Sequence, residues 1–211
     1  VYPDVLLSAT MIGTAMDCER RAVLSARLNE PGEYSMAATL GNIIHSLIQE
    51  LLRLKLLQPN QFISKGLALE VLDKIIKPFT TEVNMCNESV DSAVKTITDE
   101  HLPFIIEFVN TNVTKENARS WVQVIGSKNK RKLSVSDIID IEENIWSAKY
   151  GLKGYIDVTV ETNVDNDGKR LLAPIEIKTG KWKSNAHEAQ GLIYTLLLQD
   201  RYDIPVNAHM M

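Results

Sequence analysis

Apolar residues in the first half of the chain recur three and four positions apart, which is the spacing of an amphipathic helix. Leu47 and Leu51 belong to the clearest such stripe. The spacing predicts helices over Glu19–Arg27, Met36–Leu57, Gly66–Ile76 and Ser89–Val113. Asp17 or Ser8 is expected to cap the first, because a short side-chain oxygen accepts from free helical N–H groups. Pro103 is expected to kink or split the last, because proline lacks an amide hydrogen.

From Trp121 onward the pattern changes to alternating apolar and polar positions, which is typical of half-buried strands. In Gly154–Glu161, aliphatic residues occupy every second position. Strands are predicted over Trp121–Ile125, Ile138–Trp146, Gly154–Glu161 and Leu171–Thr179. The Asn- and Asp-rich run Asn163–Gly168 predicts a hairpin turn before the last strand. A helix is expected over Asn185–Gln199, and a further strand is expected to begin within Pro205–Met211.

This order of elements predicts a mixed α/β fold, with a mixed central sheet flanked by helices. Residues 1–120 are expected to form an N-terminal helical part, and residues 121–211 an α/β core that is truncated at its C-terminal end. Apolar residues make up 45% of the 211 positions and charged residues 24%, which excludes wholesale disorder. No apolar run approaches the roughly 20 residues of a membrane span, so no membrane partner is expected.

Charge and cysteine content limit the kinds of ligand site and scaffold that the chain can have. With a net charge of −4, contacts to nucleic acid would depend on local basic patches. One basic group is predicted to be a loop, either a localisation signal or solvated surface, and comprises Lys128, Lys130, Arg131 and Lys132. The two cysteines, Cys18 and Cys86, are too few for a disulfide scaffold or a four-cysteine metal site, so a reducing compartment is expected.

The most informative chemistry lies in two strands. Glu176 and Lys178 are two positions apart on a predicted strand, so their side chains leave the same face. Asp157 lies on the preceding strand and reaches the same end of the sheet if the two strands pair. Two neighbouring carboxylates stay ionised together only with a cation between them, and oxygen ligands favour Mg²⁺ or Mn²⁺ over Zn²⁺. The alternative is a solvated strand face with an ordinary cross-strand ion pair.

These residues also fit a known pattern. Asp157 followed by Glu176-Ile177-Lys178 resembles the PD-(D/E)xK nuclease motif. Three more segments match the RecB-type branch of that superfamily: Leu7–Arg21 (S-x-T…C-x-R-R), Gly41–His45 (G-x-x-x-H) and Gln190–Tyr194 (Q-x-x-x-Y). The resemblance covers essentially the whole chain and implies a restriction-endonuclease-like core with deoxyribonuclease activity.

The resemblance implies a role for each matching residue. Asp157, Glu176 and the main-chain carbonyl of Ile177 would hold the metal ion, with His45 as a further ligand. Lys178 would be the catalytic lysine, acting beside the two carboxylates. Without the resemblance, His45 reads as a half-buried histidine on an apolar helix.

For two further pairs of residues the sequence leaves alternatives open. Gln190 and Tyr194 share a helical face and would flank the metal pocket or touch DNA, unless they only pack the helix. Glu142 or Glu143 is expected near the metal from an earlier strand.

Within the RecB-type branch, the chain resembles eukaryotic nuclease domains that are joined to a helicase domain. That likeness implies cleavage of single-stranded DNA at 5′ flaps and resected ends, cooperation with a single-strand DNA-binding protein, and a nuclear location, with mitochondria as a second one. It also makes Cys18 the first ligand of a [4Fe-4S] cluster whose other cysteines are absent from this chain. The DNA contacts are expected from Arg20, Arg21, Lys153, Lys181, Trp182 and Lys183. The alternative is a catalytically silent nuclease-like module that binds DNA or protein.

Overall fold

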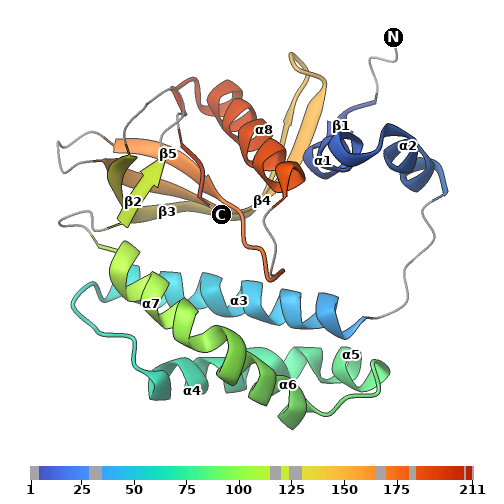
Figure 1. Ribbon diagram of the computed structural model, residues 1–211. Helices are drawn as coiled ribbons and strands as arrows, with labels where there is room; N and C mark the ends of the chain where they lie inside the picture. The colour runs from blue at the N-terminus through green and yellow to red at the C-terminus, as the bar shows by residue number, and fades with distance from the viewer. Residues whose placement is uncertain are drawn as a thin grey trace.

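The computed structural model describes residues 5–28, 35–114, 120–123, 130–164, 170–180, 184–206 and 208–210. Its helices are α1 (Ala9–Asp17), α2 (Glu19–Leu28), α3 (Met36–Leu57), α4 (Lys65–Ile76), η1 (Lys77–Phe79), α5 (Thr80–Met85), α6 (Val90–Thr96), η2 (Ile97–His101), α7 (Leu102–Asn112) and α8 (Asn185–Tyr202). Its strands are β1 (Leu7–Ser8), β2 (Ser120–Gln123), β3 (Lys130–Ser147), β4 (Leu152–Val164) and β5 (Arg170–Ile175). Helices α1 and α8 lie on one side of the mixed sheet and α3 to α7 on the other, so the predicted mixed α/β class is confirmed (Figure 1).

Strand β4 is the centre of the sheet. It pairs antiparallel with β3 along one edge, and on the other edge it pairs parallel with β1 and antiparallel with β5. In the β4–β5 register Val158 lies opposite Ile175. The residues beside this pair, Asp157 and Glu176, are therefore brought to the same place.

Helix α3 covers the first face of the sheet. It begins after Ser35, whose hydroxyl accepts from the Ala38 N–H at 3.2 Å, and its bounds match the predicted Met36–Leu57. Leu47 and Leu51 on its apolar stripe are fully buried and belong to one core with Val158 and Ala173 of the sheet. The stripe thereby fixes which residues of α3 face β4.

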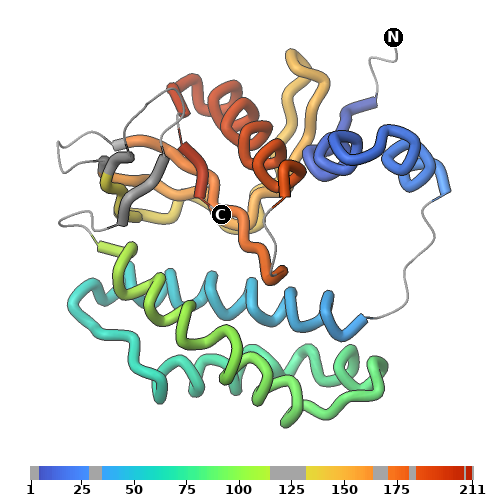
Figure 2. The backbone as a smooth tube through the Cα atoms, in the orientation of Figure 1, coloured from blue at the N-terminus to red at the C-terminus, as the bar shows by residue number. Residues whose placement is uncertain are grey.

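Helix α8 covers the opposite face together with α1. A Cβ on Gly13 of α1 would lie 2.9 Å from the Ala186 carbonyl oxygen of α8, so the two helices approach closely only because residue 13 is glycine. Figure 2 shows the N-terminal segment beside the C-terminal helix. Helix α1 therefore packs with α8 on the face of the sheet opposite to α3.

Some predicted boundaries were wrong. Strand β3 begins at Lys130, so Lys130–Lys132 lie in a strand and not in a loop, while Lys128 lies outside the described residues. Ser8 caps a separate helix, α1, and not one containing Glu19–Arg27. The strand predicted to end at Thr179 ends at Ile175, where Met210 bridges it in parallel. The expected split at Pro103 is confirmed by the π-helical turn η2, which precedes α7.

Among the described residues, no helix combines the length and the apolar character that a bilayer crossing requires.

Candidate metal and nuclease site

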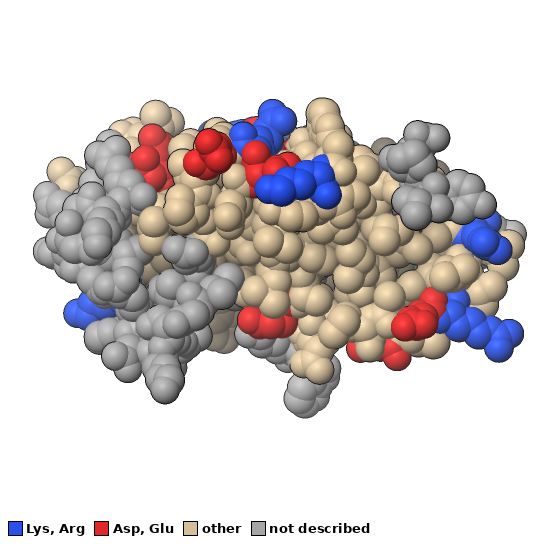
Figure 3. Space-filling model, turned by 90° about the horizontal axis from the view of Figure 1, so that it is seen from above, with Lys and Arg blue, Asp and Glu red and all other residues tan. Residues whose placement is uncertain are grey.

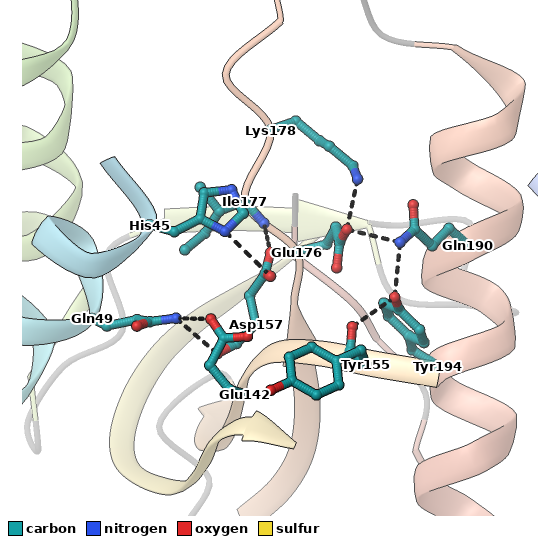
Figure 4. A network of polar contacts seen from close by, with 10 residues as sticks. All are labelled: His45, Gln49, Glu142, Tyr155, Asp157, Glu176, Ile177, Lys178, Gln190 and Tyr194. Carbon is teal, nitrogen blue, oxygen red and sulfur yellow. Dashed lines mark hydrogen bonds and ion pairs between the residues drawn. The ribbon is translucent and has the colours of Figure 1, made fainter. Parts of the chain in front are cut away.

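The candidate site lies where β4, the segment after β5, and helices α3 and α8 meet (Figure 4). Asp157 comes from β4 and is buried, with 7% of its surface exposed. Glu176 follows β5 directly and is 5% exposed. His45 and Gln49 reach these acids from α3, and Gln190 and Tyr194 reach them from α8.

Asp157 is held by three different groups. The His45 Nδ1 atom lies 3.3 Å from its Oδ1 atom. The Ile177 main-chain N–H donates to its Oδ2 atom at 2.6 Å, and the Gln49 amide donates to its main-chain carbonyl oxygen at 3.4 Å. The carboxylate therefore has a fixed orientation, with His45 on its α3 side.

Glu142 is the third acidic residue of the site. It has a φ of +58°, a left-handed conformation that costs free energy for a side chain of this kind. Its Oε1 atom accepts a hydrogen bond from Gln49. His45, Glu142 and Asp157 each offer one ligand atom, and these atoms all lie within 4.8 Å of one another. Glu143 does not reach this group, because its carboxylate accepts from Thr159 and from Tyr202.

The two carboxylate oxygens of Glu176 have different surroundings. Its Oε1 atom accepts from Lys178 Nζ at 2.6 Å and from the Gln190 amide at 2.8 Å. Its Oε2 atom is buried and has no hydrogen-bond partner among the described residues. A buried carboxylate oxygen without a donor is costly unless a cation compensates it.

Burial and the negative charge of Asp157 raise the pKa of Glu176 above its usual range, although Lys178 opposes this shift. Burial alone would lower the pKa of His45, but the hydrogen bond to Asp157 and the charges of Asp157, Glu142 and Glu176 outweigh it, and the pKa is raised. The negative charge of Asp157 contributes to both shifts, beside the burial of Glu176, and such charge attracts a cation.

Gln190 and Tyr194 extend the network along α8. The Gln190 amide donates to the Tyr194 hydroxyl, which donates to the Tyr155 main-chain carbonyl oxygen, both at 2.8 Å. The Tyr194 ring covers Gly154, where a Cβ would come within 2.6 Å of it. Burial and then the charge of Glu176 raise the pKa of Tyr194, so it stays a neutral donor. These contacts do more than pack the helix, because they connect Glu176 to β4.

The donor set fits one of the two metal groups that the resemblance implies. The close group offers two carboxylates and one imidazole, which suit a hard divalent cation such as Mg²⁺ or Mn²⁺. Glu176, a predicted ligand, is not in that group, although its Oε2 atom is buried without a hydrogen-bond partner among the described residues. A four-cysteine cluster does not fit within the described residues. Cys18 is exposed between α1 and α2, and Cys86 is half-buried with its sulfur 3.9 Å from the Thr39 hydroxyl.

The residues predicted to contact DNA are distributed unevenly. Lys153 is exposed and lines a cavity of about 410 Å³ that also includes Glu176 and Lys178. Arg20 and Arg21 are exposed on α2 and do not line that cavity. The segment Lys181–Lys183, with Trp182, lies outside the described residues. In Figure 3, acidic and basic side chains are interspersed over the described part of the visible face, so no continuous basic surface covers it.

Gln49 is the site residue that the sequence reasoning missed. It is buried and contacts both Glu142 and Asp157. The signal was present in the sequence: Gln49 follows His45 by four positions and interrupts an apolar stripe, so both side chains leave α3 on the same face.

Comparison with known proteins gives the site a family context. A family profile described as "DNA replication factor Dna2" matches residues 1–162. The chain is 42% identical over 210 residues to a Saccharomyces cerevisiae protein named "DNA replication ATP-dependent helicase/nuclease DNA2", and the match covers 99% of this chain and 14% of that protein. The equivalent proteins of Schizosaccharomyces pombe and Homo sapiens are 33% and 32% identical, over 100% and 95% of this chain and 14% and 19% of their own lengths. The chain therefore spans less than a fifth of each of these relatives.

Proposed function

The chain belongs to the Dna2 family of DNA replication factors, and from that premise we propose that it is a metal-dependent nuclease domain that hydrolyses single-stranded DNA. The observation that carries the proposal is the meeting of two buried carboxylates, Asp157 and Glu176, with the ammonium group of Lys178, which reaches Glu176 from the exposed side. A binding module would have no need for two buried carboxylates, one of them with a partnerless oxygen. The deoxyribonuclease type is that of the PD-(D/E)xK motif.

Asp157, His45 and Glu142, with Glu176 beside them, would hold Mg²⁺ or Mn²⁺. When bound, such an ion polarises a phosphate and lowers the pKa of a bound water. The Ile177 N–H keeps the Asp157 carboxylate oriented through the reaction. The main-chain carbonyl oxygen of Ile177 would be a further ligand to the metal ion.

Lys178 supplies the positive charge on the other side of the reacting phosphate. Its ammonium group offsets the charge that develops on the phosphate oxygens, or orients the attacking water. Gln190 also donates to Glu176, so this carboxylate keeps a partner when the ammonium group turns to the phosphate. The Tyr194 hydroxyl keeps the Gln190 amide in position by accepting a hydrogen bond from it.

The wider roles follow the relatives' names and the family resemblance. The substrates would be 5′ flaps and resected ends, presented by the helicase domain of the same polypeptide and by a single-strand DNA-binding protein. The location would be nuclear, with a mitochondrial pool, and Cys18 would join a [4Fe-4S] cluster whose other ligands come from outside this chain. Arg20, Arg21, Lys153, Lys181, Trp182 and Lys183 would follow the DNA strand.

End-labelled single-stranded DNA tests the proposal directly. The chain should cut it with Mg²⁺ or Mn²⁺ and stop when EDTA is added, and Asp157→Asn should bind the strand without cutting it. Binding without cleavage by the unmodified chain, at saturating metal, would instead identify a catalytically silent module.

A further inference from the structure

A second cavity opens beside the candidate site, and its character is different. It has a volume of about 320 Å³ and lies between α3, α7 and the segment after β5. Its walls are mainly apolar and include Ile48, Phe104, Ile105, Phe108, Ile177 and Met210. This volume is at the lower end of the roughly 300–1,000 Å³ of sites that bind small organic groups.

The α7 wall of this apolar groove carries aromatic side chains at helical spacing. Phe104 and Phe108 are four positions apart on α7, so they share the face that borders the groove, and His101 at the end of η2 lines it too. Phe104 is 70% exposed, although Ile105 beside it is 6% exposed and fills the core. The Phe104 ring therefore contributes little to the packing of the chain and is free to contact a ligand.

The apolar groove is continuous with the candidate site. Glu176 and Lys178 line both the apolar groove and the polar cavity of about 410 Å³ on their other side. Ser8, Thr10, Asn144 and Lys153 line the polar cavity, and these side chains suit phosphate and sugar oxygens. A group bound at Glu176 and Lys178 thus has a polar surface on one side and an aromatic, apolar surface on the other.

We propose that the apolar groove is a nucleobase subsite, which accepts the base next to the reacting phosphodiester and stacks it on Phe104. The inference rests on the proposed function, since it takes a DNA strand as the ligand. A phosphate cannot be desolvated against these apolar walls, whereas a base has an apolar face and gains from stacking. A base in a duplex is already stacked and paired, so the subsite would favour a single strand.

A binding cycle tests the proposal without any cleavage. Affinity is measured in EDTA for the chain and for Phe104→Ala, with a single-stranded oligonucleotide and with variants that carry one abasic position moved along the strand. The matched control is Phe62→Ala, because Phe62 is 69% exposed and does not line the groove. Thermal melting checks that each variant is folded.

At one strand position, removing the base should weaken binding to the unmodified chain about tenfold, which is the scale of one lost stacking contact. Phe104→Ala should lose about the same factor with the intact strand and be insensitive to the abasic change there. Phe104→Trp should restore the sensitivity, and Phe62→Ala should behave as the unmodified chain. If Phe104→Ala binds the intact strand normally, or responds to every abasic position as the unmodified chain does, the subsite proposal is overturned.

Failure of the subsite and failure of the proposed function give different results. Metal-dependent cleavage by the unmodified chain, with no coupling between Phe104 and any base, leaves the nuclease proposal standing and removes the subsite. Coupling without cleavage by the unmodified chain does the reverse.

Discussion

The α3 side and the α8 side of the candidate site differ in what they offer to the two carboxylates. On the α3 side, Asp157 lies beside His45 and Gln49 of α3 and Glu142 of β3. His45 and Glu142 are potential metal ligands. On the α8 side, Lys178 and Gln190 both donate to Glu176. Potential metal ligands therefore surround Asp157, whereas hydrogen-bond donors surround one oxygen of the Glu176 carboxylate.

This difference suggests that the two sides of the site have different roles in the proposed reaction. Changes on the α3 side should act on metal affinity, whereas changes on the α8 side should act on the chemical step or on the stability of the sheet.

Asp157 lies between the two sides, and its loss should have the largest effect. Asp157→Asn removes the charge that the metal needs while keeping an oxygen for the Ile177 N–H, and cleavage should fall by about 10³-fold. Single-turnover cleavage rates measure this. Asp140→Asn, an exposed acid on the neighbouring strand β3, is the control and should cut at the normal rate. A normal rate for Asp157→Asn would contradict its assignment.

Lys178→Ala should reduce cleavage about 10²-fold, because one positive donor to the transition state is lost. Its Mn²⁺ affinity should fall far less than its cleavage rate, since Lys178 contacts only Glu176 among the proposed ligands and none of His45, Glu142 and Asp157. Calorimetric titration with Mn²⁺ and cleavage assays on the same protein separate the two quantities. Lys149→Ala, an exposed lysine near the end of β3, provides the comparison. A large loss of Mn²⁺ affinity would place Lys178 on the cation-binding side.

The pH dependence of metal binding follows from two raised pKa values. His45 and Glu176 must both lose a proton to become ligands, and both hold it to a higher pH than usual. The Mn²⁺ affinity should therefore rise about tenfold as the pH rises from about 6 to about 8. In the metal-free chain the sign is opposite: these groups stabilise the fold below their unfolded pKa values, and that contribution is lost as the pH rises through the folded ones.

Melting curves with and without Mn²⁺ measure both trends. Replacing the imidazole, as in His45→Gln, should flatten the metal-dependent shift, whereas His187→Gln at the start of α8 should leave it as it is. A metal-dependent shift that grows as the pH falls would contradict the assigned signs.

Gln49→Leu should weaken Mn²⁺ binding about tenfold, because the amide that orients Glu142 and Asp157 is lost. DNA binding in EDTA should be unchanged, which distinguishes a positioning role from general damage to the fold. Gln58→Leu, at the exposed C-terminal end of the same helix, is the matched control. Unchanged metal affinity in Gln49→Leu would mean that Glu142 does not depend on this contact.

Tyr194→Phe should have the smallest effect on cleavage and a visible effect on stability. The hydroxyl bridges Gln190 and the Tyr155 carbonyl, so its removal should lower the free energy of unfolding by about 1 kcal/mol. Denaturant unfolding measures the loss, with the more exposed Tyr150→Phe for comparison. A loss of cleavage comparable to that of Lys178→Ala would give the hydroxyl a direct part in the chemistry.

The sequence predicted α3 well because its apolar residues keep a regular spacing, and it located α8 although Leu192 and Leu196 of the expected stripe are exposed. Helix α3 has the predicted bounds, and α8 runs three residues beyond the predicted Gln199. Strand β3 was predicted eight residues too short at its start, because register shifts between Val135 and Asp137 and between Ile138 and Asp140 interrupt the period of two. The short helix Thr80–Met85 was missed, because a single turn and a half shows no periodicity.

The site could be predicted where a motif fixed the spacing and not where geometry decided. Asp157, Glu176 and Lys178 lie together, because antiparallel pairing carries the first acid opposite the second. Glu142 and Glu143 could not be separated from the sequence, since the left-handed backbone at Glu142 has no local signal such as glycine or asparagine. Gln49 shares a helical face with His45, but its role depends on the contacts with Glu142 and Asp157, which only the folded chain brings together.

Met210 ties the far end of the described chain to the site by backbone alone. Its N–H donates to the Pro174 carbonyl oxygen at 2.9 Å, and its carbonyl oxygen accepts from the Glu176 N–H at 3.0 Å. The two bonds would survive any replacement of the Met210 side chain except proline, so the main-chain position of Glu176 is insensitive to the identity of residue 210.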